Sequence, residues 1–335
     1  MKLRRFASMA LATATLALAS ASVRADTPPS IWERAKDPDA AEAFDLHQAI
    51  QQRLIRTAIA EVDFGERGRV LAMLERVGAE KSKNALLRFD LGHVHLLLEN
   101  HARAAQVYKA AIAEFPDHPA VDQAWLRLAF ACGHLGDHVC ERNAYVEVLR
   151  RETEEIYRAT PTLNLAETQM HLGDLKEAIE GYREALRIAG RVPARETAPL
   201  ATWGLAVALD RAGDRLAAER EARFAIEIER SMGLPRLLRS KDVFFVPDYE
   251  IHWYEGLGAV ARARVATSAR EAVSRWRQAE KSFGDYVEAG ERKKDQWLPI
   301  AKARLTQIKT ERERAEAAAK REPAAADTFG RDIDI

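Results

Sequence analysis

Residues 164–186, NLAETQMHLGDLKEAIEGYREAL, contain the pattern that decides the fold. A small residue, Ala166, follows a leucine, and a second small residue, Ala178, stands twelve positions later. Tyr182 and Ala185 follow at helical spacing. Small residues let the backbones of two antiparallel helices approach closely, and an aromatic ring fills the widening space beside them. The stretch therefore predicts a helical hairpin.

A Gly-Asp pair marks the turn of this hairpin at residues 173–174, and the same pair recurs at 136–137 and 213–214. Glycine can end a helix in the left-handed conformation, and aspartate can cap the start of the next helix. We therefore expect three turns of the same kind.

The hairpin pattern repeats along the chain. Leucine is followed by a small residue at Gly92, Ala129, Ala166, Ala206 and Gly258, with spacings of 37, 37, 40 and 52 positions. Together with the Gly-Asp turns and the tyrosines, these residues resemble the tetratricopeptide repeat family, whose unit is about 34 residues long. The resemblance covers residues 85–282.

Three features depart from the family pattern. Glu141 replaces a small residue, Ala222 replaces the aromatic residue, and two extra residues precede Ala272 in the last unit. The resemblance implies an all-α fold, a right-handed α-solenoid of stacked antiparallel helix hairpins. In such a solenoid the first helices of the hairpins line a concave face.

The first residues are typical of a secretory signal peptide. Lys2, Arg4 and Arg5 precede an uncharged, alanine- and leucine-rich stretch at 6–22, and small residues follow at the positions that a signal peptidase reads. Cleavage is expected after Ala25, with residues 19–21 as the alternative point. The mature protein is therefore expected to be periplasmic or secreted, of the bacterial exported type.

The rest of the chain divides by pattern. Apolar residues at helical spacing predict a divergent hairpin before the repeats, and an Ala/Glu/Lys/Arg-rich run ends the chain. The expected parts are a signal peptide at 1–25, a linker at 26–38, a helical hairpin at 39–80, five repeat hairpins at 85–282 with an inserted connection at 231–250, a capping helix region at 283–310, and a helical or disordered tail at 311–335.

Composition argues against two classes of partner. The 51 basic and 51 acidic residues balance, so nothing global suggests nucleic-acid binding. No segment after the signal peptide is long and apolar enough to span a membrane. The resemblance implies a protein or peptide partner. Neither the identity of that partner nor the oligomeric state follows from the sequence.

The resemblance places the binding surface on the concave face. Helical projection predicts that this groove is lined by Leu86, Phe89, His93, Leu97, Arg127, Phe130, Asn164, Glu167, Met170, Trp203 and Val207. Each of these residues can instead pack against a neighbouring helix. Phe89 and His93 stand where some relatives carry the lysine and asparagine that hold a carboxylate, so that subclass is not expected.

The inserted connection contains four consecutive apolar β-formers, Val243-Phe244-Phe245-Val246. Such a run needs burial. We expect it to fold back onto the fourth and fifth hairpins. The alternatives are that it contacts a partner or occupies the groove itself.

No catalytic, cofactor or metal motif is recognisable. His93 and His95 are two positions apart on a predicted helix and point to different faces, and His134 and His138 straddle a turn. Neither pair has the spacing and supporting ligands of a zinc site.

Cys132 and Cys140 are the two cysteines of the chain and flank the turn at 136–137. In an oxidising compartment they are candidates for a disulfide, and otherwise for two small buried thiols.

The sequence is therefore interpreted as a non-catalytic protein-interaction scaffold or adaptor of the cell envelope. The alternatives are an all-α enzyme acting on the cell wall, with a site that the sequence does not reveal, and a purely structural spacer.

Overall fold

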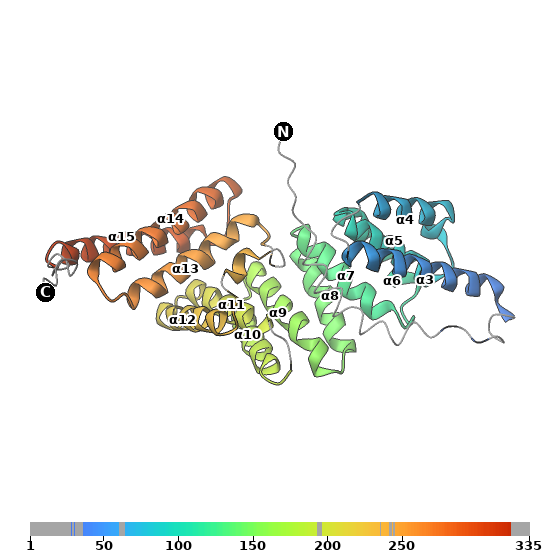
Figure 1. Cartoon of the computed structure of the whole chain (residues 1–335), viewed down its shortest axis with the longest axis horizontal. Helices are drawn as coiled ribbons and strands as arrows, with labels where there is room; N and C mark the ends of the chain where they lie inside the picture. Colours follow the sequence, from blue (N-terminus) through green and yellow to red (C-terminus); the bar gives the residue numbers. More distant parts are fainter. Residues whose placement is uncertain are drawn as a thin grey trace, which may run out of the picture. The chain divides into compact units, whose positions relative to one another are not determined.

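A computed structural model describes residues 28, 30, 36–59, 64–192, 196–234, 236–240, 243 and 245–322. Every regular element that these residues form is a helix, and consecutive helices pack as antiparallel hairpins (Figure 1). The predicted all-α fold of helical hairpins is therefore confirmed. The predicted signal peptide and the end of the predicted tail lie outside the described residues. Among the described helices, none combines the length and apolarity needed to cross a bilayer.

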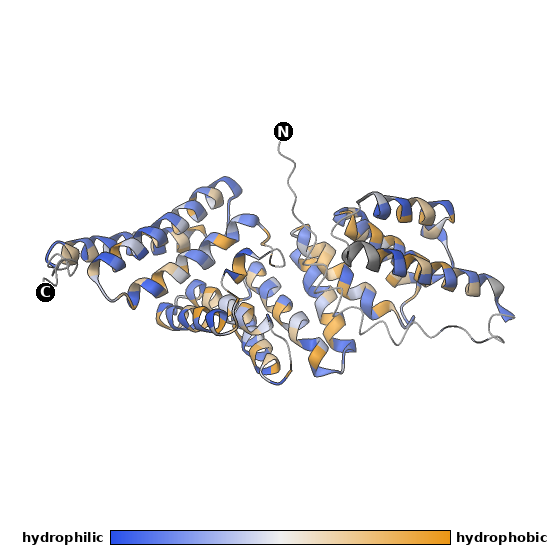
Figure 2. Cartoon of the chain, viewed as in Figure 1, coloured by the Kyte–Doolittle hydropathy of each residue, from blue (hydrophilic) through white to orange (hydrophobic). Residues whose placement is uncertain are grey.

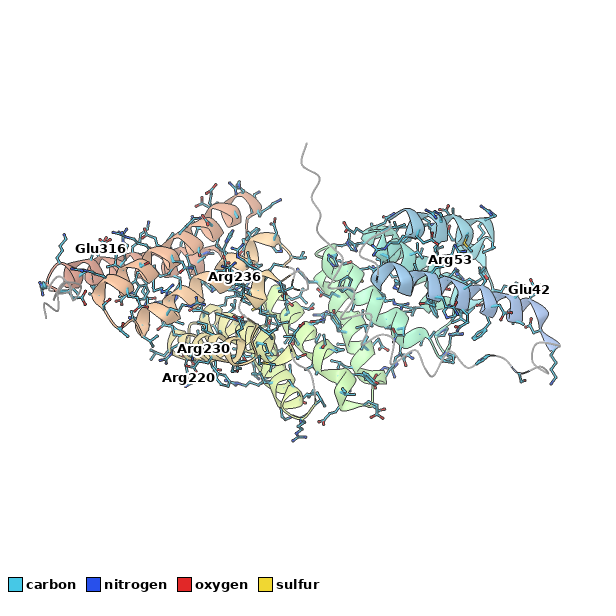
Figure 3. All side chains as sticks on the ribbon, in the orientation of Figure 1. Glu42, Arg53, Arg220, Arg230, Arg236 and Glu316 are labelled. Carbon is cyan, nitrogen blue, oxygen red and sulfur yellow. A yellow bond between two sulfur atoms is a disulfide. The ribbon has the colours of Figure 1, made fainter. Side chains whose placement is uncertain are left out.

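Contacts group the chain into two compact units, each with its own packing. The first unit comprises Met1–Gly204 and Glu229–Pro247, and the second comprises Leu205–Ile228 and Asp248–Ile335. In both units hydrophobic and hydrophilic residues are interspersed along the helices (Figure 2). Charged side chains, such as Arg53, project outward from the helices (Figure 3).

The first unit begins with two divergent helices followed by three regular hairpins. The N-terminal hairpin consists of α3 (Pro38–Ile59) and α4 (Phe64–Arg76), and the first hairpin consists of α5 (Ala85–Leu97) and α6 (His101–Glu114). The second hairpin consists of α7 (Val121–His134) and α8 (His138–Arg151). The third hairpin consists of α9 (Glu155–Leu172) and α10 (Leu175–Ala189). A short 3₁₀ turn, η2 (Ala79–Lys81), precedes α5.

The fourth hairpin, α11 (Thr197–Arg211) with α12 (Arg215–Ser231), contributes residues to both units. Two 3₁₀ turns, η3 (Leu237–Arg239) and η4 (Asp248–Glu250), lie in the inserted connection. The second unit continues with the fifth hairpin, α13 (Ile251–Arg264) with α14 (Ala269–Lys293), and ends with α15 (Leu298–Ala319).

The small residues and aromatic rings pack as the repeat pattern predicts. Tyr108 and Tyr182 are fully buried, and so are the repeat alanines around them. A methyl group built on Gly92 would lie 2.8 Å from the Tyr108 ring, and one on Gly204 would lie 2.2 Å from the Tyr182 ring. Glycine is therefore required where these rings meet the neighbouring helix.

The hairpin turns also form as predicted, with one exception. Gly136, Gly173 and Gly213 have φ values of 68°, 90° and 92°, in the left-handed region. Asp137 caps α8 by accepting a hydrogen bond from the backbone N–H of Cys140 at 3.1 Å. Asp174 makes no such side-chain cap for α10.

The last helix, α15, spans parts of two predicted regions. It begins at Leu298, inside the predicted capping region at 283–310, whose first residues belong instead to α14, and it continues through most of the charged run to Ala319. Just beyond it, the Glu322 carboxylate accepts hydrogen bonds from the backbone N–H groups of Ala269 and Arg270 at 3.0 and 3.3 Å. These two N–H groups begin α14, so the charged run supplies the acid that caps an earlier helix.

Candidate binding face

Most of the predicted groove residues are covered in this structure. None of the following seven side chains is more than 7% exposed: Leu86, Phe89, His93, Leu97, Met170, Trp203 and Val207. They pack between helices and present no surface to a partner in this conformation. The accessible part of the predicted groove is therefore smaller than helical projection suggested.

Helix α3 explains part of the difference. Leu97 shares a hydrophobic core with Ile50 and Leu54 of α3. Phe89 packs into the core of the first two hairpins and meets the ring of His118 edge-on at 5.8 Å. Helical periodicity identifies which face of α5 is apolar, but it does not show which later or earlier helix covers that face.

A buried polar centre also fastens α3 to α5. Asp90 is 1% exposed, and its carboxylate contacts Nδ1 of His47 at 2.7 Å and Nε2 of Gln51 at 2.6 Å. Nearby, burial and the positive charge of Arg127 hold the pKa of His93 well below its ordinary value. No local sequence pattern predicts this centre, because its members lie about forty residues apart.

Four predicted residues remain half-buried and reachable: Arg127 and Phe130 on α7, and Asn164 and Glu167 on α9. Each pair is three positions apart, so its members share one face of their helix. We call these four residues the accessible face. It offers a cation, an aromatic ring, an amide and a carboxylate on the first helices of two successive hairpins.

Tyrosines of the preceding hairpins lie near two members of this face. Tyr145 of α8 is buried, and its hydroxyl accepts a hydrogen bond from Nδ2 of Asn164 at 3.0 Å. Burial raises the pKa of Tyr108 in α6, while the charge of the nearby Arg127 acts to lower that pKa. The third tyrosine, Tyr182, meets Gly204 at the equivalent junction. The hydrogen bond from Asn164 to Tyr145 therefore positions this member of the face between successive hairpins.

Histidines form a second feature of the first unit. The rings of His101 and His134 stack with centroids 4.2 Å apart, and those of His138 and His171 stack at 4.6 Å. The sequence analysis paired His134 with His138, whereas the structure pairs each with a ring of a neighbouring hairpin. The signal was present in the sequence, because both stacked pairs are 33 positions apart and recur after 37 positions.

The pKa values of the two rings in the first stack, His101 and His134, are lowered. Burial and the neighbouring His101 lower the pKa of His134 to about 4. Burial also lowers the pKa of His101. Both rings are therefore neutral at pH 7, and two neutral rings can stack without charge repulsion.

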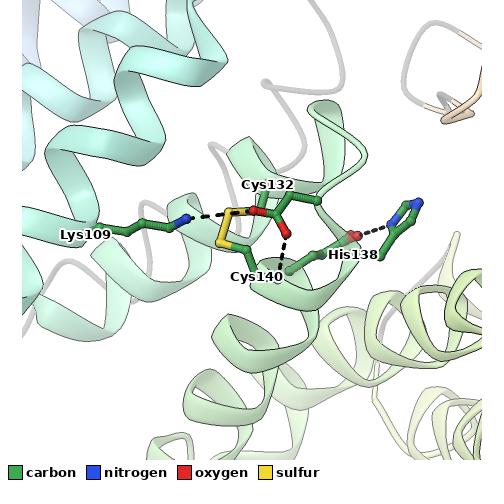
Figure 4. The surroundings of a disulfide bond; sticks show 6 residues. Lys109, Cys132, His138 and Cys140 are labelled. Carbon is green, nitrogen blue, oxygen red and sulfur yellow. Dashed lines mark hydrogen bonds and ion pairs between the residues drawn. A yellow bond between two sulfur atoms is a disulfide. The ribbon is translucent and has the colours of Figure 1, made fainter.

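The two cysteines are joined in a disulfide at the turn of the second hairpin (Figure 4). Their Cα atoms are 5.8 Å apart. Asp137 lies beside the bond and forms an ion pair with Lys109 at 3.8 Å. One oxygen of Asp137 and both sulfurs lie within 4.8 Å of one another. Thiolates are the metal-binding form of cysteine, so the bonded sulfurs are not available as metal ligands.

The second unit has a buried ionic core. The Arg211 side chain is fully buried, contacts Glu250 at 2.6 Å and lies over the rings of Trp253 and Trp297 at 4.5 and 5.0 Å. Tyr286 donates a hydrogen bond to Glu250 at 3.1 Å. This network ties α11, η4, α13 and α14 together and offers no open site.

A shallow pocket of about 400 Å³ lies on the outside of the second unit. Its lining includes the carboxylates of Asp248, Asp285 and Glu288 together with His252 and two basic residues. The charges are mixed, and the lining residues come from η4, the start of α13 and the second half of α14.

Comparisons with known proteins agree with the repeat pattern. The family described as "Tetratricopeptide repeat" matches residues 163–191. No curated protein sequence matches the chain.

Several solved structures resemble the chain at low sequence identity. A MamA RS-1 double mutant is 16% identical and covers 56% of this chain and 96% of its own, with a TM-score of 0.46. A Rap protein complexed with competence and sporulation factor is 13% identical and covers 91% and 94%, with a TM-score of 0.45. The TPR domain of P58(IPK) is 14% identical and covers 88% and 71%, with a TM-score of 0.35.

Proposed function

We infer, from the premise that this chain is a tetratricopeptide-repeat protein, that it is a non-catalytic scaffold which binds a peptide or protein segment through the accessible face. One observation carries this proposal. Arg127, Phe130, Asn164 and Glu167 remain reachable on two successive first helices, while the equivalent side chains of the first hairpin are covered.

The side chains of the accessible face indicate which residues a bound segment would carry. An aromatic ring between groups of opposite charge suits a segment with one apolar side chain flanked by both an acidic and a basic residue. Tyr145 holds Asn164 in place, so part of the surface is preorganised and loses little side-chain freedom on binding.

We further propose that the protein works outside the cytoplasm, in the cell envelope. The signal-peptide pattern in residues 1–25 supports export. The bond between Cys132 and Cys140 supports an oxidising compartment, because disulfides persist there and are rare in the cytosol.

The test is capture of partners on immobilised protein, followed by quantitative mass spectrometry. Arg127→Glu combined with Phe130→Ala removes the cation and the ring of the accessible face. We expect the captured partner to fall at least tenfold, because interface anchors of this kind dominate binding. Arg150→Glu, on α8 with a side chain 59% exposed, is the matched control and should leave capture unchanged.

Melting curves must show that the double variant stays folded. Equal capture by a folded double variant would contradict the assignment of this face. Release of fragments from cell-wall material by the unmodified protein would favour the alternative, an enzyme acting on the wall.

A further inference from the structure

The inserted connection returns to a hairpin that lies far earlier in the chain. Just before the connection, Glu229 of α12 accepts a hydrogen bond from Nε1 of Trp203 of α11 at 2.6 Å, inside the fourth hairpin. At the end of the connection, Cγ1 of Val246 lies 3.9 Å from a methyl group built on Gly136, at the turn of the second hairpin. All four residues belong to the first unit. Val246 therefore lies beside the turn of the second hairpin, which was not among the expected neighbours of the connection.

Among the described residues of the connection, those near its ends are more deeply buried than those in its middle. Leu237 and Leu238 are 3% and 8% exposed, and Tyr249 and Glu250 are 8% and 2% exposed. Between them, residues 243 and 245–247 are only half-buried and form no helix. We call the described residues 243 and 245–247 the strap. A half-buried, non-helical stretch lies on a surface as a bound peptide does, whereas core residues of this unit are fully buried.

The surface beside the strap is apolar and partly open. Leu135 and Val139 flank Gly136 on either side of the turn, and they are 47% and 52% exposed. Val246 adds an apolar side chain next to this turn. The disulfide of Cys132 and Cys140 closes the same turn, so the backbone that presents these side chains is fixed.

We propose that the turn of the second hairpin is a docking surface for extended apolar segments, and that the strap is its built-in occupant. A partner segment would carry β-branched and aromatic residues, as the strap does, and would bind by displacing it. This inference rests on the proposed function and adds a second recognition surface to it, outside the accessible face.

The first experiment supplies the strap in trans. In one variant, residues 243–246 are replaced by Gly-Ser-Gly-Ser, which keeps the chain length. A fluorescein-labelled peptide of residues 240–249, SKDVFFVPDY, is titrated against this variant and against the unmodified protein. We expect the variant to bind the peptide at least tenfold more tightly, because its surface is vacant. The control peptide carries the change Val246→Asp and should bind at least tenfold more weakly than the unmodified peptide.

A second measurement covers the case in which the replaced variant fails to fold. Benzoylphenylalanine is placed at position 246 of the otherwise unmodified protein and photolysed. We expect crosslinks to residues 128–142, the tryptic fragment that contains Gly136, and loss of those crosslinks when the free peptide is present in excess.

The outcomes separate this inference from the proposed function. A folded variant that does not bind the peptide, or crosslinks that excess peptide leaves unchanged, would overturn the strap proposal. The capture experiment on the accessible face would be unaffected by either result, since it uses neither the peptide nor the strap.

Discussion

At the scale of single residues, the glycines that face aromatic rings have a direct energetic role. Gly204→Ala places a methyl group 2.2 Å from the Tyr182 ring, so the ring or a backbone must shift. We expect the free energy of unfolding of the first unit to fall by about 1–3 kcal/mol, as for overpacked cores. Urea unfolding followed by circular dichroism measures the change.

The matched control is Gly68→Ala, inside α4, where an added methyl group meets nothing within 4 Å. Alanine is the better helix former, and we expect a gain of about 0.5–1 kcal/mol there. Equal effects of the two substitutions would contradict the close packing of Gly204.

In the second unit, the buried Arg211 is a single residue on which stability is expected to depend. Arg211→Ala leaves the Glu250 carboxylate buried, at 2% exposed, without its ionic partner. We expect a loss of about 3–5 kcal/mol, the usual cost of breaking a buried pair on one side. Arg220→Ala is the control, because this side chain is 68% exposed (Figure 3) and should change stability by less than about 0.5 kcal/mol. A loss below about 1 kcal/mol in the Arg211 variant would show that the pair contributes little.

At the scale of elements, the disulfide holds the end of α7 to the start of α8. The cysteines are eight positions apart, and chain-entropy arguments give a bridge over so short a loop about 2–3 kcal/mol. We expect that loss in the double variant Cys132→Ala, Cys140→Ala, and the same loss in the unmodified protein under a reducing agent. Alkylation without reduction, followed by mass spectrometry, tests the bond itself, and two alkylated thiols would exclude it.

The stacked histidines make the packing of neighbouring helices sensitive to pH. Folding lowers the pKa of His134 to about 4, so between pH 6.5 and 4 the unfolded chain binds a proton that the folded chain does not. Stability therefore falls as pH drops through this window, by at most about 1.4 kcal/mol per pH unit for one such group. His134→Phe keeps a stacked ring and should lessen the fall in the urea midpoint between pH 7 and pH 5. If the urea midpoints of the two proteins fell by the same amount between pH 7 and pH 5, the pH dependence would not come from His134.

Local sequence predicted the elements well because their causes are local. The Gly-Asp turns formed at 136–137, 173–174 and 213–214, since a left-handed residue needs only glycine at the right place. The groove was less predictable, because periodicity gives the apolar face of α5 but not the helix that covers it. The position of Val246 beside Gly136 depends on a contact across more than one hundred residues, which no local pattern contains.

At the scale of the whole molecule, we expect the protein to be exported and its signal peptide to be removed. We expect the mature chain to begin at Asp26, because the small residues before it match the positions that signal peptidase reads. Mass spectrometry of the protein from the periplasm of an expressing bacterium measures the N-terminus. An intact residue 1 on protein recovered from the cytoplasm would argue against export, and a start at residue 22 would support the alternative cleavage point.

The tyrosine junctions have a consequence for how such a chain can change by duplication. Tyr108 meets Arg127, Tyr145 meets Asn164, and Tyr182 meets Gly204, so each ring finds a different residue in the hairpin that follows it. A tandem copy of the third hairpin would present Tyr182 to an asparagine that is fitted to a different ring. The hairpins have similar backbones, yet one hairpin cannot simply replace another. The residue that faces the preceding tyrosine differs at each junction between hairpins. A duplicated hairpin would therefore pack well only after this residue had changed too.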